Sequence, residues 1–142
     1  MTADNSKKGV YASASEHCQS DALFFFDGRP AALSLYQALL ARMRGIFPTL
    51  SVRVQKSQIS FYGMHLFAMV SLPRRKCEAG IFVSFGFGRR VDSPRISTAT
   101  QPYPGRWTHH VLLSSQAQID REFLDWLREA WEFSEEKRRR AT

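Results

Sequence analysis

The spacing of apolar residues changes twice along this chain, and this change constrains the fold more than any other feature. Over residues 30–46 apolar side chains recur every three or four positions, which is typical of an amphipathic helix. Over 52–87 and 107–113 they alternate with polar residues or form short apolar runs, as β-strands do. Helical spacing then returns over 114–136. This order predicts an α+β fold: a two-layer domain with a mainly antiparallel sheet of about five strands and an N-terminal and a C-terminal amphipathic helix.

Both helices carry signals for their ends. Pro30 suits a first helical turn, where its missing N–H is no loss, and Gly45 and Pro48 predict an end near residue 46. The second helix is predicted over 114–136, with Ser115 and Gln118 at capping-box spacing. The apolar stripes are Ala32, Leu35, Tyr36, Leu39, Met43 and Ile46 in the first helix and Ile119, Phe123, Leu127, Ala130 and Trp131 in the second.

The strands are predicted in two blocks, with four inside 52–87 and another inside 107–113. The run HLFAMVSL, 65–72, is apolar almost throughout, which predicts a central strand covered on both faces. Residues 88–106 have no regular period and hold several prolines and glycines. A loop of this length in a compact domain is predicted to be functional or partly disordered.

The length of 142 residues fits one domain with a hydrophobic core. We expect a flexible polar leader over 1–20, a single domain over 21–134 and a basic tail over 135–142. No apolar run reaches the roughly 18 residues of a membrane span, and the N-terminus lacks the apolar core of a secretion signal. Two cysteines, Cys18 and Cys77, lie outside any CxxC motif, which favours a reduced, cytoplasmic protein.

Two adjacent histidines, His109 and His110, stand in the strand pattern GRWTHHVLL. Because neighbouring side chains of a strand point to opposite faces, these two cannot jointly bind one metal ion there. His109 is predicted to lie in the core, and His110 shares the more polar face and is the expected ligand contact. Zinc-enzyme spacings, a GxSxG elbow and a complete GxGxxG fingerprint are missing, so we expect no metal and no cofactor and assign no catalytic residue.

Arg89, Arg90, Arg95 and Arg106 bracket the stretch VDSPRISTATQPYPG, 91–105, of the irregular segment 88–106. Guanidinium groups suit carboxylates and phosphates. A polar row from Lys56 to Tyr62 on a predicted strand is expected to face the same side. The sequence therefore predicts an anion-binding surface formed by Arg90, Arg95, Arg106, His110, Lys56 and Tyr62. The alternative is that these arginines are solvated, with Asp92 pairing one of them.

The net charge of +7 permits an anionic partner without requiring one. The favoured function is a non-catalytic binding or interaction module with a basic surface, whose partner is a small anionic ligand or nucleic acid and not a membrane. The alternative is a small enzyme acting on a phosphate- or carboxylate-bearing substrate in a pocket of Lys56, Arg95, Arg106 and His110. Exposure of the run LFFF, 23–26, and of Trp126, off the main helix stripe, would suit a homodimer.

Several segments also carry a family resemblance: FFDGRPAALSLYQALLARM, VQKSQISFYG, SPRI, PGRWTHHVLLSS and IDREFLDWLREAWEF. Together they span about 24–133 and resemble the bacterial family described as domain of unknown function 5655. The resemblance implies a small α/β domain and no established activity, substrate or cofactor. Some relatives carry a leader rich in cysteine and histidine, of which this chain keeps only His17 and Cys18, without a preceding CxxC.

Overall fold

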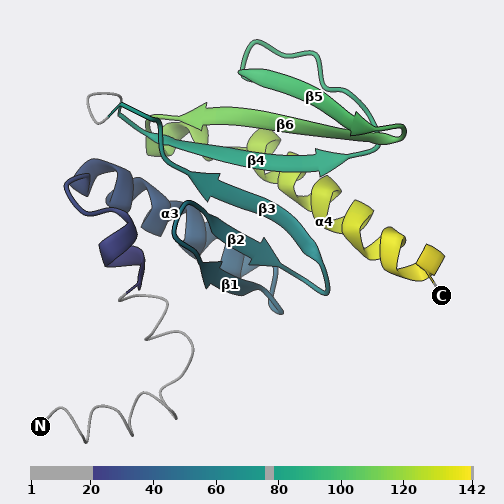
Figure 1. The fold of residues 1–142 in the computed structure, drawn as a ribbon, viewed down its shortest axis with the longest axis horizontal. Helices are drawn as coiled ribbons and strands as arrows, with labels where there is room; N and C mark the ends of the chain where they lie inside the picture. Colours follow the sequence, from purple (N-terminus) through teal and green to yellow (C-terminus); the bar gives the residue numbers. More distant parts are fainter. Residues whose placement is uncertain (1–20, 76–78, 142) are drawn as a thin grey trace, which may run out of the picture.

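The computed structural model describes residues 21–75 and 79–141, with side chains described as far as residue 136 (Figure 1). A short helical turn over 21–25 precedes the main elements. These are α3 (Pro30–Ile46), β1 (Ser51–Val54), β2 (Ile59–Tyr62), β3 (Leu66–Ser71), β4 (Ile81–Phe87), β5 (Thr98–Tyr103), β6 (Arg106–Leu113), the 3-10 turn Gln116–Gln118 and α4 (Arg121–Ala141). The predicted leader, with His17 and Cys18, lies outside the described residues, as does Cys77. The backbone of α4 continues through 135–141, so the helix extends into the segment predicted as a tail.

The strands form one antiparallel sheet in the order β1-β2-β3-β4-β6-β5. The predicted α+β architecture with an antiparallel sheet is therefore confirmed, with six strands instead of about five. The first four strands follow one another as a meander. After β4 the chain crosses to the far edge of the sheet and forms β5 there. It then turns back as β6, which fills the place between β5 and β4.

The extra strand, β5, lies inside the segment 88–106 that was predicted to be irregular throughout. It pairs with β6 from Thr98 opposite His110 to Tyr103 opposite Arg106, across a turn where Gly105 has a φ of 86°. A positive φ favours glycine because other residues meet a steric clash there. The prediction was wrong because β5 is a polar edge strand with no buried face, so it shows no apolar alternation.

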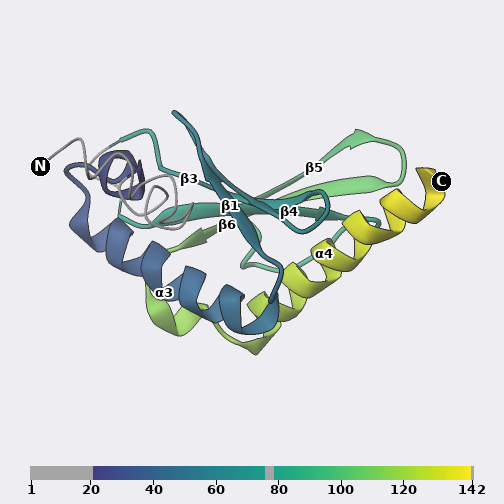
Figure 2. The ribbon, with the colours of Figure 1, turned by 90° about the horizontal axis from the view of Figure 1, so that it is seen from below.

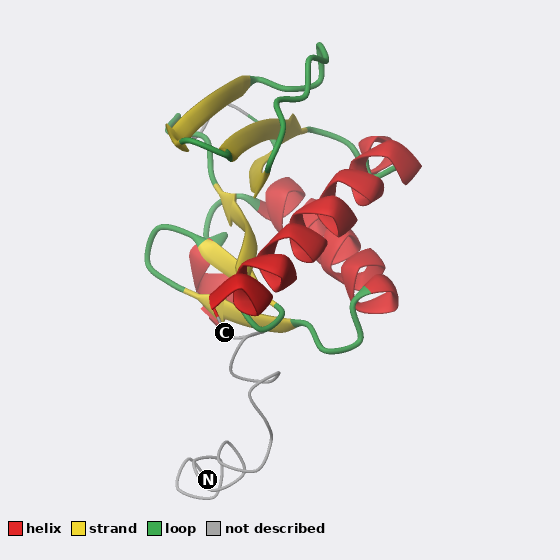
Figure 3. Ribbon diagram, turned by 90° about the vertical axis from the view of Figure 1, so that its right-hand side faces the viewer, coloured by secondary structure: helices red, strands yellow, loops and turns green. Residues whose placement is uncertain are grey.

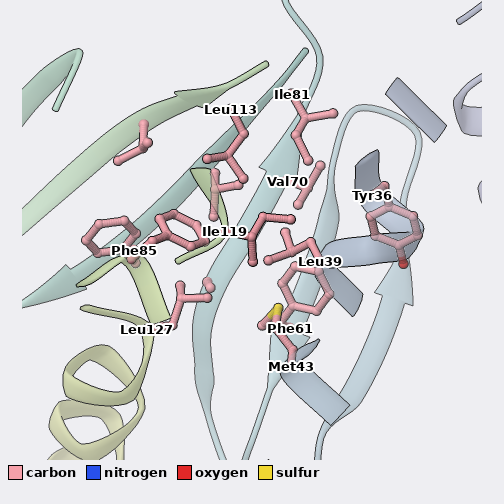
Figure 4. Packing of buried hydrophobic residues seen from close by; sticks show 14 of the residues in the cluster. Tyr36, Leu39, Met43, Phe61, Val70, Ile81, Phe85, Leu113, Ile119 and Leu127 are labelled. Carbon is pink, nitrogen blue, oxygen red and sulfur yellow. The ribbon is translucent and has the colours of Figure 1, made fainter. Parts of the chain in front are cut away.

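Both helices lie on the same face of the sheet, which makes the domain two layers deep (Figures 2 and 3). Alternation along β4 explains this, because Ile81, Val83 and Phe85 are buried on the helix side. The predicted helix stripes are mostly confirmed: Leu39 and Met43 of α3 and Leu127 of α4 meet Phe61 and Phe85 of the sheet in one core (Figure 4).

Within residues 21–75 and 79–141, no helix lies on the opposite face of the sheet (Figure 2). The prediction that the run 65–72 is covered on both faces was therefore wrong. Phe67 and Val70 are buried, whereas Met69 and Ser71 are only half-buried. Apolar side chains on this face are partly shielded by neighbouring strands instead of by a helix. We call this helix-free side the open face.

The last helix starts later than the capping-box spacing predicted. Gln118 accepts hydrogen bonds from the backbone N–H groups of Ser114 and Ser115, but this arrangement closes the short 3-10 turn. The first turn of α4 is capped by Asp120, whose carboxylate accepts from the N–H of Phe123 at 3.0 Å. Asp120 is favourable here because a carboxylate satisfies free N–H groups and meets the positive end of the helix dipole.

The exposure predicted for apolar residues is correct for only part of the set. Leu23 and Phe24 are exposed, at 57% and 83%, whereas Phe26 is buried. Trp126 is 6% exposed, so the prediction that it lies on the surface was wrong. It packs against Phe85 and under the guanidinium of Arg95, which together cover the indole. Within the described ranges, none of the helices is both long and apolar enough to cross a membrane.

Candidate functional site

The open face of the sheet carries a hollow of about 710 Å³, which we call the sheet hollow. It is shallow and is formed by alternate residues of four strands and the loops beside them. Its lining residues are Gln58, Met69, Ser71, Arg74, Phe82, Ser84, Ser97, Thr98 and His110. Its volume falls within the range of small-molecule sites in proteins.

A row of directly paired residues crosses the sheet through this hollow. Thr98 of β5 lies opposite His110 of β6, His110 lies opposite Ser84 of β4, and Ser84 lies opposite Met69 of β3. Residues paired across antiparallel strands share a face, so register alone places all four side chains on the open side. The centre of the row is polar, and Met69 at its end contributes apolar surface to the hollow.

Ser84 and His110 form a close hydrogen-bonded pair at the centre of the hollow. The Ser84 hydroxyl lies 2.7 Å from Nδ1 of His110. Burial lowers the pKa of His110, so the imidazole is neutral near pH 7. In the tautomer where Nδ1 accepts the serine proton, Nε2 carries the ring hydrogen and is a donor.

A second set of polar contacts fixes the side of the hollow next to the start of β2. The Ser60 hydroxyl, which is fully buried, donates to the side-chain carbonyl of Gln55 at 2.8 Å and accepts from the Gln58 amide at 3.0 Å. The β1–β2 turn is closed by the Gln55 N–H donating to the Gln58 carbonyl. These bonds fix Gln58, whose side chain lines the hollow.

The sheet hollow carries positive charge. Arg74 is the one charged side chain among the described residues that line it, and no acidic side chain of the described ranges is part of that lining. A second guanidinium lies nearby, because a Cβ added to Gly86 would come within 2.6 Å of Arg106. Gly86 follows Ser84 by two residues in β4 and so faces the same side. The Arg106 guanidinium therefore lies over Gly86, and its carbon is also 6.0 Å from the centre of the Phe133 ring of α4.

The predicted anion-binding residues do not all converge. Arg95 lies on the helix side, where its guanidinium binds Asp120 and Glu122, each at 2.9 Å, and donates to the carbonyl of Gln118 at 2.7 Å. It is a structural clamp on the start of α4, and both carboxylates raise its pKa against the effect of burial. Arg90 is exposed, with its guanidinium 5.6 Å from the centre of the Trp107 ring.

The two members predicted on the second strand also lie apart from His110. Lys56 is exposed in the turn between β1 and β2. Tyr62 ends β2, half-buried, under the guanidinium of Arg53 at 4.9 Å from the ring centre. Of the six predicted ligand-binding residues, His110 lines the sheet hollow, and Arg106 lies over Gly86 outside that lining.

His109 has the core position that the sequence predicted. It is fully buried against Phe85 and Phe87, with ring centres 5.5 and 4.8 Å away. Its Nε2 accepts the backbone N–H of Val91 at 3.0 Å, which ties the segment that follows β4 to β6. Burial lowers the pKa of His109, so it too stays neutral in the folded protein.

These two histidines give a testable dependence of stability on pH. In the unfolded chain they take up protons as the pH falls through about 6.5, whereas the folded protein resists this because burial lowers both pKa values. The unfolded state then binds more protons, so the free energy of unfolding is expected to fall between about pH 7.5 and 5.5. Urea unfolding at both pH values measures this. His110→Gln, which removes one of the two groups, should show a smaller fall; an equal fall would contradict the assignment.

Sequence reasoning missed Ser84 and Arg74. Ser84 lies between the apolar residues Val83 and Phe85 of a strand, and its partner depends on the register between β4 and β6, which the sequence does not state. Among the described residues, no group of three or more histidine, cysteine, aspartate or glutamate side chains is arranged to hold a metal ion.

The molecule is thus an α+β domain whose two helices cover one face of an antiparallel sheet and whose other face carries a polar, basic hollow. The chain belongs to the family described as domain of unknown function (DUF5655), whose model matches residues 24–134. Searches of the curated proteins and of the solved structures gave no match to this chain.

Proposed function

We propose that this domain is a binding module that takes a small anionic molecule into the sheet hollow. The observation that carries the proposal is the lining itself: a guanidinium, an imidazole, hydroxyls and an amide surround about 710 Å³ on a face without a helix. Ser84 is buried and His110 is half-buried, whereas Arg74 and Thr98 are exposed. No carboxylate of the described residues is part of this lining, which favours a ligand that supplies negative charge.

The ligand is expected to combine two parts. Arg74, the Nε2–H of His110 and the hydroxyl of Thr98 are donors that suit a phosphate or carboxylate. Met69 and Phe82 line the same hollow and offer apolar surface. A small molecule with an anionic group joined to an apolar or aromatic part satisfies both. Binding sites for small molecules typically combine such surfaces.

An enzyme pocket of Lys56, Arg95, Arg106 and His110 receives less support, because Arg95 is bound to acids on the other side of the sheet. Duplex nucleic acid is the alternative partner for a basic surface. It would contact many phosphates, and its affinity would fall steeply with salt, with a slope near −0.9 per phosphate contacted. A hollow of this size with one arginine in its described lining favours a small molecule instead.

The test compares Arg74→Ala with Arg75→Ala, because Arg75 is the exposed neighbour that does not line the hollow. Phenyl phosphate is the probe and inorganic phosphate its smaller relative, with affinity measured by calorimetry. Losing one charge-assisted hydrogen bond should weaken phenyl phosphate binding about 10-fold to over 100-fold in Arg74→Ala. Arg106→Ala should also weaken binding, whereas Arg75→Ala should bind as the wild type does.

Three outcomes would contradict the proposal. The first is that neither phenyl phosphate nor inorganic phosphate binds the wild type at millimolar concentration. The second is an equal loss of affinity in Arg74→Ala and Arg75→Ala, which would assign the effect to net charge. The third is a short DNA duplex that binds far more tightly than phenyl phosphate, with the steep salt dependence of many phosphate contacts.

A further inference from the structure

We propose that Ser84 is a nucleophile activated by His110, and that the sheet hollow accepts esters or thioesters whose acyl group is transferred to Ser84. The inference rests on the hollow of the proposed function and goes beyond binding. It does not need the ligand to carry a negative charge. The observation behind it is the 2.7 Å hydrogen bond between the Ser84 hydroxyl and Nδ1 of His110.

This pair has the geometry that nucleophilic catalysis requires of a serine and its base. A serine hydroxyl becomes a useful nucleophile when a neighbouring base accepts its proton during attack, at a heavy-atom distance of about 2.6–3.2 Å. The two residues are directly paired on neighbouring strands, so the backbone ladder of β4 and β6 holds them in register. Both side chains line the hollow, where a substrate carbonyl would lie.

The base is available in the protonation state that this role needs. Burial is the cause of the lowered pKa of His110, and no acidic partner contributes to the shift. The imidazole is therefore neutral near pH 7 and able to accept a proton on Nδ1. His109, the adjacent histidine, is buried on the other face and already accepts the Val91 N–H, so it does not compete for Ser84.

Arg106 is the cation that this proposal assigns to the oxyanion. Its guanidinium lies against Gly86, where a Cβ would come within 2.7 Å of the guanidinium carbon, and that carbon is also 6.0 Å from the centre of the Phe133 ring. Ser84 and Gly86 are two residues apart on one strand face, a spacing of about 7 Å. A substrate bound over β4 would bridge this spacing. Its carbonyl oxygen, which becomes negative on attack, would then be stabilised by the cation.

The step balances within the groups named. The Ser84 oxygen attacks the carbonyl carbon, its proton passes to Nδ1 of His110, and the carbonyl oxygen becomes an oxyanion near Arg106. The bond from carbon to the leaving alkoxide or thiolate then breaks, and the leaving group takes the proton from His110. The products are an acyl-Ser84 and a free alcohol or thiol. Water attacking the acyl-serine would return Ser84 and release a carboxylic acid.

The experiment measures covalent labelling of the full chain by diisopropyl fluorophosphate, which phosphorylates activated serines with loss of fluoride. Intact-mass spectrometry is expected to show one adduct per chain, and peptide mapping should place it on Ser84. Ser84→Ala should abolish this adduct. Ser71→Ala is the matched control, because Ser71 lines the same hollow from β3, and it should label as the wild type does.

A second set of variants separates activation from structure. His110→Gln retains a hydrogen-bond acceptor for Ser84 but takes no proton, so labelling should slow about 100-fold or more. Gly86→Ala displaces the Arg106 guanidinium without removing its charge, and labelling should slow at least about 10-fold. In the wild type, the labelling rate should fall as acid protonates His110. Release of nitrophenolate from para-nitrophenyl acetate should follow the same order of variants.

Each negative outcome has a definite meaning. No adduct on Ser84 in the folded wild type overturns the inference, as does equal labelling of wild type and His110→Gln. If a variant fails to fold, the pH profile of the wild type still decides, because an unactivated serine has no inflection belonging to a histidine. Phenyl phosphate binding without labelling leaves the binding function standing alone. Labelling without phosphate binding supports the nucleophile and removes the anion site.

Discussion

Gly80→Ala is expected to lower the free energy of unfolding by about 3 kcal/mol or more. Gly80 precedes β4 with a φ of 102°, which L side chains rarely adopt. An added Cβ would also collide with the backbone carbonyl oxygen of Leu113, which belongs to the end of β6 and cannot rotate away. To relieve this clash, the paired strands β4 and β6 would have to move apart. Since small domains are stable by about 5–15 kcal/mol, this single methyl group removes a large share.

The same substitution at Gly45 is the matched control. Gly45 lies in α3, and an added Cβ there has no atom within 4 Å among its described surroundings. Alanine is the better helix former, so Gly45→Ala should raise stability by up to about 1 kcal/mol. Urea unfolding monitored by tryptophan fluorescence measures both variants. If both substitutions changed the free energy of unfolding with the same sign and by the same amount, the backbone at Gly80 would not be strained.

Phe123→Ala is expected to cost about 3–5 kcal/mol. Phe123 is fully buried in the first turn of α4, and its ring meets the edge of Phe85 with ring centres 6.3 Å apart. Truncation would leave a cavity between α4 and β4 at the contact of Phe123 with Phe85. The backbone N–H of Phe123 is also the group that Asp120 caps, so the cavity would open beside the helix start.

The control for this cavity is Arg121→Ala, two residues earlier in the same turn. Arg121 is exposed and lies at the positive end of the helix dipole, where its charge is unfavourable. Its loss should leave stability within about 0.5 kcal/mol of the wild type. Thermal unfolding of both variants measures the difference. A loss at Arg121 as large as that at Phe123 would mean that helix propensity, and not packing, holds α4 in place.

Local signals predicted the elements that have a strong apolar period. The helix predicted near 30–46 is α3 with those bounds, because Pro30 and the residues around Pro48 fix its ends by backbone chemistry. The last helix was predicted too early, since the pattern around Ser115 and Gln118 fits a capping box whether a full helix or a 3-10 turn follows. β5 was not predicted from the sequence because an exposed edge strand needs no apolar face.

The candidate site was predicted less well, for a physical reason. Charge-rich segments showed where arginines are in the chain but not what they contact, and Arg95 is neutralised by Asp120 and Glu122, more than twenty residues away. His110 was assigned to the polar face by alternation within one strand, which local reasoning can do. Its pairing with Ser84 depends on strand register across 26 residues, which the pattern of one strand does not contain.

The open face of the sheet has a consequence for how the ligand preference of such a domain can change. Along β4 and β6, residues that support the core alternate with residues that line the hollow, so the two sets share a backbone but touch different surroundings. Exchanging Met69, Phe82 or Thr98 alters the chemistry offered to a ligand and leaves the contacts of the helices unchanged. A library confined to those positions should therefore retain its melting temperature while its ligand preference changes. Such a scaffold can acquire new specificities one alternate residue at a time, without first being restabilised.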